Sequence, residues 1–245
     1  MAFLQLYRVA ILCSHIIAFN VCENLDVTKV QDQRAYDLKL FSKRFFTGWN
    51  VGFQILFLMV ALVNATIHQK VFKPWVSSRV KIFTNRLQGY IFTCLVAPST
   101  IFVVCMFWTL WSIDRELVLS EVLDAVVPSW LNHALHTVII IPVVVELLFC
   151  KMHLPHHKDA LTVLATVHVV YTAVLMGTYF EYGRWIYYVF KVLPWPGKFA
   201  LCLLSFLLSV AAYFIGYKFQ QIRWHSDIVQ QIKLHTKSLQ SMINF

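Results

Sequence analysis

The chain has 245 residues, of which 59% are hydrophobic and only 13% are charged. Because soluble domains carry about 25% charged residues, this composition excludes an ordinary soluble fold and leaves no room for a separate soluble domain. The formal net charge is +9, but the basic residues form short clusters between apolar segments, which suits the anionic headgroups of membrane lipids and not nucleic acid.

Six apolar segments are long enough to cross a bilayer, which takes about 20 residues of helix. They predict an all-α fold class, a six-span polytopic transmembrane helical bundle in which residues 1–245 form one transmembrane domain. Between the last two spans, residues 185–195 are aromatic but too short to cross, so we expect them in the membrane interface. Residues 218–245 form a basic amphipathic tail. The predicted spans are residues 2–21, 46–67, 89–112, 129–150, 160–180 and 198–217.

The basic residues of the connections predict the orientation of the bundle. Residues 68–88 contain five lysines and arginines and no acid, whereas residues 114–128 contain one base, Arg115, and four acids. Cytoplasmic loops carry an excess of lysine and arginine, so both termini are expected in the cytoplasm. The expected location is the plasma membrane or an endomembrane such as the endoplasmic reticulum.

The histidines and cysteines do not form a recognisable metal-binding pattern. His153, His156 and His157 match the H-x-x-H-H box of membrane di-iron enzymes. The other histidine cluster, however, opens the fourth span and lies at the far end of a helix of roughly 30 Å, so the two clusters cannot share a metal. A di-iron site of this kind is therefore excluded, and His153, His156 and His157 are interpreted as a solvated loop that faces the lipid headgroups. The six cysteines have no paired spacing.

The densest polar cluster in an apolar segment opens the fourth span. Asn132, His133, His136 and Thr137 lie within six residues, although an ionisable group in a membrane helix costs roughly 2.5–3.5 kcal/mol. Residues three and four apart share a helix face, so both histidines and Asn132 are expected on one face. Three interpretations fit: packing bonds to neighbouring helices, ligation of a metal or haem, or acyl chemistry with a histidine as general base.

A hydroxyl partner for these histidines is available at the same depth. The second and fourth spans run in the same direction, so Thr47, which opens the second span, lies near the same membrane face as His133 and His136. Taken alone, a threonine at the end of a span usually bonds the preceding backbone turn. Glu146 lies about 15 Å beyond His136 along the helix, which is too far to orient it, and its burial requires a partner.

An ordered series of motifs resembles the androgen-induced gene 1 family. It is tightest between residues 97 and 146, contains the string WLNHALHT at residues 130–137, and is similar to the family over the whole chain. The resemblance implies a membrane-embedded hydrolase of fatty acid esters of hydroxy fatty acids, with a lipid substrate and no cofactor. It implies Thr47, in the string RFFT at residues 44–47, as the nucleophile and His136 as the base, with His133 in support.

Several further roles are expected on this interpretation. An oxyanion formed during acyl transfer needs a hydrogen-bond donor, for which Asn132 and His133 are candidates. The carboxylate of a lipid could pair with Arg115, Lys43 or Arg44, or these bases could only anchor the interface. The chain departs from the family's strings at residues 119–120, 43–44 and 185–188, which affects the expected substrate range more than the reaction type.

Two alternatives remain open at this point. A haem- or metal-binding redox protein would use His15, His133 or His136, and His168, and the purified protein would show a Soret band or bound iron. A non-catalytic membrane adaptor would keep its biological effect when Thr47 and His136 are replaced by alanine. The sequence does not indicate which proteins the chain binds.

Overall fold

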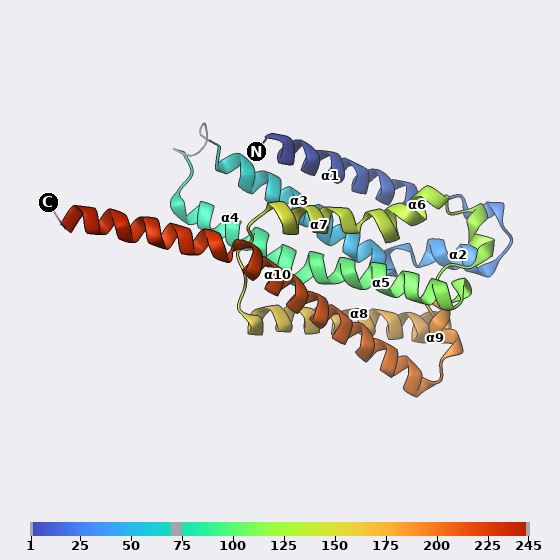
Figure 1. Ribbon diagram of the computed structural model, residues 1–245. Helices are drawn as coiled ribbons and strands as arrows, with labels where there is room; N and C mark the ends of the chain where they lie inside the picture. Colours follow the sequence, from blue (N-terminus) through green and yellow to red (C-terminus); the bar gives the residue numbers. More distant parts are fainter. Residues whose placement is uncertain (1, 70–74, 244–245) are drawn as a thin grey trace.

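The computed structural model describes the backbone of residues 2–69 and 75–243 and the side chains of residues 3–69 and 75–224. Within these ranges the chain is all-α, as predicted, and has no strands. Figure 1 shows the helices side by side in one bundle. The α-helices are α1 (Ala2–Glu23), α2 (Gln33–Leu40), α3 (Phe46–Ile67), α4 (Ser78–Ile91), α5 (Ala97–Ile113), α6 (Ser129–His133), α7 (Ile140–Phe149), α8 (His157–Tyr182), α9 (Tyr188–Val192) and α10 (Trp195–Ile243).

Shorter turns join these helices or interrupt them. Two are π turns inside spans, namely η3 (Phe92–Val96) and η6 (Ala134–Val138). The others are 3₁₀ turns in the connections at one end of the bundle, namely η1 (Val27–Lys29), η2 (Ser42–Arg44), η4 (Arg115–Leu117) and η5 (Glu121–Ala125).

Six helical segments of the described chain are long and apolar enough to cross a membrane, which confirms the predicted number of spans. α4, η3 and α5 form one of them, and α6, η6 and α7 form another. Many of the large apolar side chains on their outer faces are exposed, such as Val169 at 69% and Phe199 at 59%, which is expected where the neighbours are lipid tails. The segments are Phe3–Glu23, Phe46–Ile67, Ser78–Ile113, Ser129–Phe149, His157–Tyr182 and Trp195–Trp224.

The third and sixth spans differ from their predicted bounds. The third begins at Ser78, because the Ser77 side chain caps the helix by accepting a hydrogen bond from the Val80 amide. Much of the predicted basic loop at residues 68–88 is therefore helical, while residues 70–74 lie outside the described residues. α10 continues without a break from the sixth span to Ile243, and the predicted amphipathic face of the tail beyond residue 224 lies outside the described side chains.

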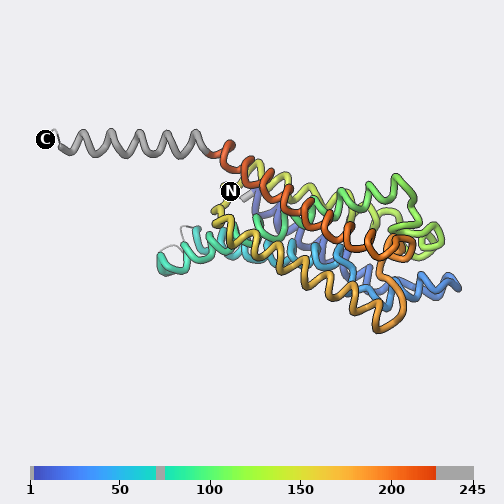
Figure 2. Tube along the Cα trace, turned by 90° about the horizontal axis from the view of Figure 1, so that it is seen from below, coloured from blue at the N-terminus to red at the C-terminus, as the bar shows by residue number. Residues whose placement is uncertain are grey.

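Successive spans alternate in direction, as consecutive crossings of one membrane must. The start of α1 and the end of the sixth span, within α10, lie at one end of the bundle, as Figures 1 and 2 show. α2, α9 and the connection between α5 and α6 lie at the other end. α3 and α6 both begin at this second end, so their first turns lie at the same level, as predicted from the order of the spans.

Glu146 has a buried partner in the first span. Arg8 Nε and Nη2 donate to the two carboxylate oxygens of Glu146 at 2.6 and 2.7 Å, and Arg8 Nη2 also lies 3.2 Å from Cys150 Sγ. Arg8 is 4% exposed and Glu146 is fully buried. This bidentate pair joins α1 to α7 and supplies the partner that a buried carboxylate requires.

Gly89 marks a close approach between α4 and the connection before α8. A Cβ atom at this position would overlap the backbone of His153. Replacing Gly89 by alanine is therefore expected to destabilise the protein by about 1–3 kcal/mol, because the backbone must move apart. Gly52→Ala is the matched control, since nothing lies within 4 Å of its Cβ position. Thermal unfolding of purified protein in detergent measures both, and an unchanged midpoint for Gly89→Ala would contradict the close approach.

Candidate active site

Thr47 and His136 contact each other at the end of the bundle where α3 and α6 begin. Thr47 lies in the first turn of α3, which starts after Phe45 adopts an extended conformation. His136 lies in η6, the π turn that follows α6. Thr47 Oγ1 is 3.3 Å from His136 Nε2. The structure thus brings together the two residues that the sequence placed at a common depth.

The hydrogen bonds of His136 Nδ1 determine the tautomer of the imidazole ring, and hence whether Nε2, which faces Thr47, carries a proton. His136 Nδ1 lies 3.1 Å from the Asn132 carbonyl oxygen and 2.8 Å from Asn132 Oδ1. A carbonyl oxygen can only accept, so Nδ1 carries the hydrogen and Nε2 has the free lone pair. The Thr47 hydroxyl therefore donates to Nε2, which is the arrangement of a nucleophile and its base. Asn132 thus orients the histidine through its oxygens, and its expected role as an oxyanion donor stays a prediction.

α5 holds the imidazole ring of His136 in place. The Phe107 ring stacks on it with centroids 3.7 Å apart and an interplanar angle of 11°. Trp108 Nε1 donates to the His136 carbonyl at 2.8 Å, and Gln54 Nε2 donates to the Ile139 carbonyl at 3.1 Å. Side chains from neighbouring helices thus satisfy backbone oxygens at a π turn, where the α-helical hydrogen-bond series is interrupted. Phe107 and Trp108 lie in the part of the chain, residues 97–146, where the family resemblance is tightest, but the sequence did not indicate them as supports of this histidine.

Thr47 and His136 line a cavity of about 940 Å³. This volume lies near the upper limit of the roughly 300–1,000 Å³ that is usual for small-molecule sites. Much of the wall beside the two residues is aliphatic, which suits acyl chains. The aliphatic lining includes Val51, Val103, Leu110, Leu123 and Leu175.

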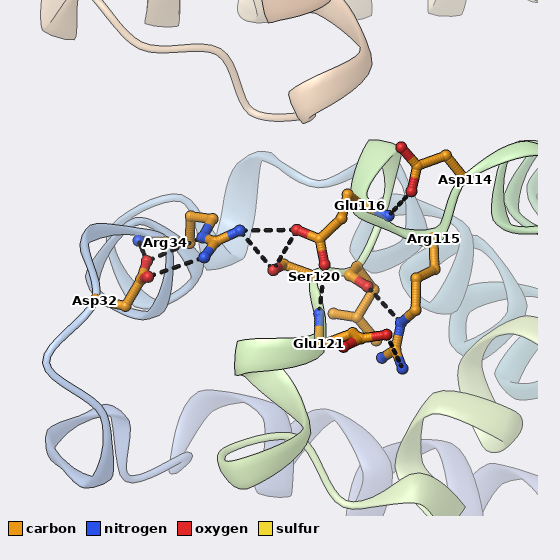
Figure 3. A network of polar contacts seen from close by, with 8 residues as sticks. Asp32, Arg34, Asp114, Arg115, Glu116, Ser120 and Glu121 are labelled. Atoms are coloured by element: carbon orange, nitrogen blue, oxygen red, sulfur yellow. Dashed lines mark hydrogen bonds and ion pairs between the residues drawn. The ribbon is translucent and has the colours of Figure 1, made fainter.

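A polar network outside the spans forms one rim of this cavity. Arg34, from α2, donates to Glu116 Oε2 at 2.8 Å and to Ser120 Oγ at 2.6 Å, and it also pairs with Asp32. Figure 3 shows Arg34 between Asp32 on one side and Glu116 with Ser120 on the other. Hydrogen bonds from Ser120 and from the Glu121 amide, together with Arg34, lower the pKa of Glu116 below its ordinary value. Glu116 therefore stays ionised at neutral pH. The network joins the connection between the first two spans to the connection between the third and fourth spans.

Two tyrosines contact the backbone beside Thr47. The Phe46 amide donates to both Tyr171 Oη and Tyr187 Oη at 3.0 Å, and the Tyr171 hydroxyl donates to Tyr187 Oη at 3.0 Å. Both tyrosines line the cavity. Among the described contacts, the hydroxyl hydrogen of Tyr187 has no acceptor, so it is available to a ligand.

The other histidines considered from the sequence are dispersed. His133 is exposed, stacks on Trp108 and lies 3.2 Å from Thr137 Oγ1. Unlike His136 it does not line the cavity, because the π turn changes the angular spacing between the two histidines. His15 Nε2 lies 2.7 Å from Gln54 Oε1, and His168 Nε2 lies 3.2 Å from Ser209 Oγ. No group of three or more His, Cys, Asp or Glu side chains that could hold a metal ion occurs among the described residues.

None of the three bases expected to bind a lipid carboxylate lines the cavity, and two of them form ion pairs elsewhere. Arg115 Nη2 lies 2.7 Å from Asp124 Oδ1, and Arg44 Nη1 lies 3.0 Å from Glu181 Oε2. Neither these two residues nor Lys43 lines the cavity. They are therefore not placed to bind a ligand inside it. The lysines and arginines that do line it are Arg34, Arg184, Lys191 and Lys198.

Comparison with known proteins gives the family. The human androgen-dependent TFPI-regulating protein is 35% identical over 142 residues, which cover 58% of this chain and 62% of that protein. The same protein from Mesocricetus auratus is 30% identical over 190 residues, or 78% and 80% of the two chains. The human androgen-induced gene 1 protein is 30% identical over 101 residues, or 41% and 42%.

No solved structure matches the chain. The model of one family, described as FAR-17a/AIG1-like protein, matches residues 5–221 and so covers most of the six spans. The chain therefore belongs to the FAR-17a/AIG1-like protein family of membrane proteins.

Proposed function

We propose that the chain is a membrane-embedded lipid ester hydrolase that cleaves fatty acid esters of hydroxy fatty acids, with Thr47 as nucleophile and His136 as base. The observation that carries this proposal is the 3.3 Å contact between Thr47 Oγ1 and His136 Nε2 on the wall of a cavity that many aliphatic and aromatic side chains line. The Asn132 oxygens fix the imidazole tautomer that such a base needs. A threonine hydroxyl is a weak nucleophile unless a base of this kind activates it.

The reaction would proceed in two steps. Thr47 Oγ1 attacks the ester carbonyl while His136 Nε2 takes the hydroxyl proton, and the resulting tetrahedral oxyanion collapses with cleavage of the bond to the alcohol oxygen. The alcohol leaves with the proton from His136, so that a hydroxy fatty acid is released and an acyl-threonine remains. Water then attacks the acyl group, His136 takes a proton from it, and the fatty acid leaves as Thr47 regains its proton.

The Tyr187 hydroxyl is the proposed donor to the oxyanion. It lies beside the backbone of Thr47, since it accepts a hydrogen bond from the Phe46 amide, and its own hydrogen is directed to no described acceptor. Burial raises the pKa of Tyr187 above its ordinary value, so the phenol keeps its proton. A preorganised donor of this kind stabilises charge that develops only in the transition state.

Tyr187→Phe is accordingly expected to lower kcat about 100-fold, which is typical of losing one oxyanion donor, with a smaller change in KM. Tyr171→Phe should reduce kcat less, because it removes only a hydrogen bond to Tyr187. Tyr188→Phe is the matched control, since this tyrosine lines the same cavity and contacts neither Phe46 nor Tyr171 in the described structure. A larger loss of kcat in Tyr171→Phe than in Tyr187→Phe would contradict the proposal that Tyr187 is the oxyanion donor.

The proposed reaction is tested by product analysis. Purified wild-type protein and Thr47→Ala are incubated with an esterified hydroxy fatty acid in water enriched in ¹⁸O. Equimolar release of the two acids by wild type, with label in the fatty acid and no release by Thr47→Ala, supports the hydrolase. Absence of release by wild type, or release that persists in Thr47→Ala, contradicts it.

A further inference from the structure

Lys198 differs from the other bases of the cavity in being buried without an acidic partner. It lies in the first turns of α10, lines the cavity and is only 7% exposed. Its ammonium group donates to the Leu193 carbonyl. Within the described part of the chain no carboxylate lies within ion-pairing distance of it. A buried charge without a counter-ion is costly, so an anion at this point would be strongly favoured.

The other three bases of the lining are already neutralised or lie at the surface. Arg34 is paired with Asp32 and Glu116. Arg184 is paired with Asp37. Lys191 is exposed, so its charge remains hydrated. Lys198 is therefore the cation of the cavity that has most to gain from an anionic ligand.

Two indole rings hold Lys198 in place. Lys198 Nζ lies 5.3 Å from the centroid of the Trp185 ring and 5.3 Å from that of the Trp195 ring. These cation–π contacts position the ammonium group without supplying a negative charge. Trp185 also lines the cavity. The two rings thus fix the position of the Lys198 ammonium group but do not neutralise its charge.

The shape and chemistry of the cavity identify the class of anion. Lys198 and the Thr47–His136 pair line one continuous cavity, and much of its remaining wall is aliphatic or aromatic. A ligand that satisfies both ends is a long apolar chain with an ester near Thr47 and a single negative charge near Lys198. One buried ammonium group balances one negative charge, which matches a carboxylate.

We propose that Lys198, held between Trp185 and Trp195, binds the free carboxylate of an acyl chain in the cavity, so that the protein selects lipid esters that carry an ionised carboxyl group over neutral esters. The selectivity for esters rests on the proposed hydrolase function. The binding of an acyl carboxylate is independent of that function, because it requires only the cavity and Lys198. Lys198 is thus a positioning and specificity residue, and it does not take part in the chemical steps.

Binding measurements test whether Lys198 binds a carboxylate, and turnover measurements test whether it gives selectivity among esters. Wild type, Lys198→Met, Lys198→Arg and the control Lys191→Met are reconstituted in nanodiscs, with protein-free discs as the blank. Binding of stearate is compared with binding of methyl stearate, which has the same chain and no charge. Hydrolysis of an esterified hydroxy fatty acid is compared with hydrolysis of its methyl ester.

Lys198→Met is expected to weaken stearate binding about tenfold or more, as for a lost charged hydrogen bond, and to leave methyl stearate unaffected. Its KM for the free-acid ester should rise by a similar factor with kcat retained, while Lys198→Arg and Lys191→Met stay close to wild type. Equal losses for acid and methyl ester, or no loss for either, would overturn the proposal. If wild type hydrolyses neither ester, the hydrolase function fails, and the stearate comparison still decides the carboxylate site.

Discussion

His136→Ala is expected to lower kcat for ester hydrolysis by at least about 1,000-fold, with little change in KM. In the proposed reaction the imidazole takes the Thr47 proton through Nε2, which lies 3.3 Å from Thr47 Oγ1, and has no other part in binding the acyl chain. Removing it therefore removes transition-state stabilisation and leaves the binding of the chain in the cavity intact. Thr47→Ala should cause a loss of similar size, since the nucleophile and the base act as one unit.

The double variant distinguishes a catalytic pair from two structural residues. Thr47→Ala combined with His136→Ala is expected to lose no more activity than either single variant, because either change already disables the pair. His133→Ala is the matched control, since this imidazole lies three residues away, is exposed and is outside the cavity. Steady-state kinetics on purified variants with equal helix content measure all four. Additive losses, or a comparable loss in His133→Ala, would falsify the assignment.

Breaking the ion pair between Arg8 and Glu146 is expected to destabilise the bundle by about 3–5 kcal/mol. Arg8→Met leaves a carboxylate buried among apolar side chains, and Glu146→Leu leaves a buried guanidinium group. Each unpaired charge must be neutralised or drawn to water, and both outcomes weaken the packing of α1 against α7. The expected measurement is a lower midpoint of thermal unfolding in detergent and a lower yield of folded protein.

The double variant Arg8→Met with Glu146→Leu should recover most of that stability, because apolar side chains of similar volume often replace a buried pair without loss. Lys29→Met serves as the control, since it removes a positive charge from an exposed position in η1. A double variant as unstable as the single ones would mean that packing around the pair, and not the unpaired charge, causes the loss.

The number and approximate bounds of the spans could be predicted from the sequence. A membrane span depends on a local sum, the apolar character of about 20 successive residues, and no long-range contact is needed to evaluate it. The order of the spans also placed Thr47 and His136 at one level, because alternate crossings run in the same direction. The resemblance of the strings at residues 44–47 and 130–137 then selected these two residues for a catalytic role, which remains a prediction.

The surroundings of that pair could not be read from the sequence. Thr47 and His136 are 89 residues apart, and Arg8 and Glu146 are 138 apart, so their contacts depend on which helices pack together and how each is rotated. The π turn at η6 also changes the angular spacing of His133 and His136, which local periodicity assumed to be α-helical. Hence His136 lines the cavity and His133 does not.

The sequence by itself determined that the chain crosses the membrane six times and carries polar groups where lipid disfavours them. Only the tertiary structure decided which partner each of those groups has. Arg8 pairs with Glu146, and His136 contacts Thr47 and the Asn132 oxygens. Lys198 contacts two aromatic rings and a carbonyl group but no acid among the described residues. The physical reason is that hydrophobicity accumulates along the chain, whereas hydrogen bonds and ion pairs depend on distances and directions that exist only after the helices have packed.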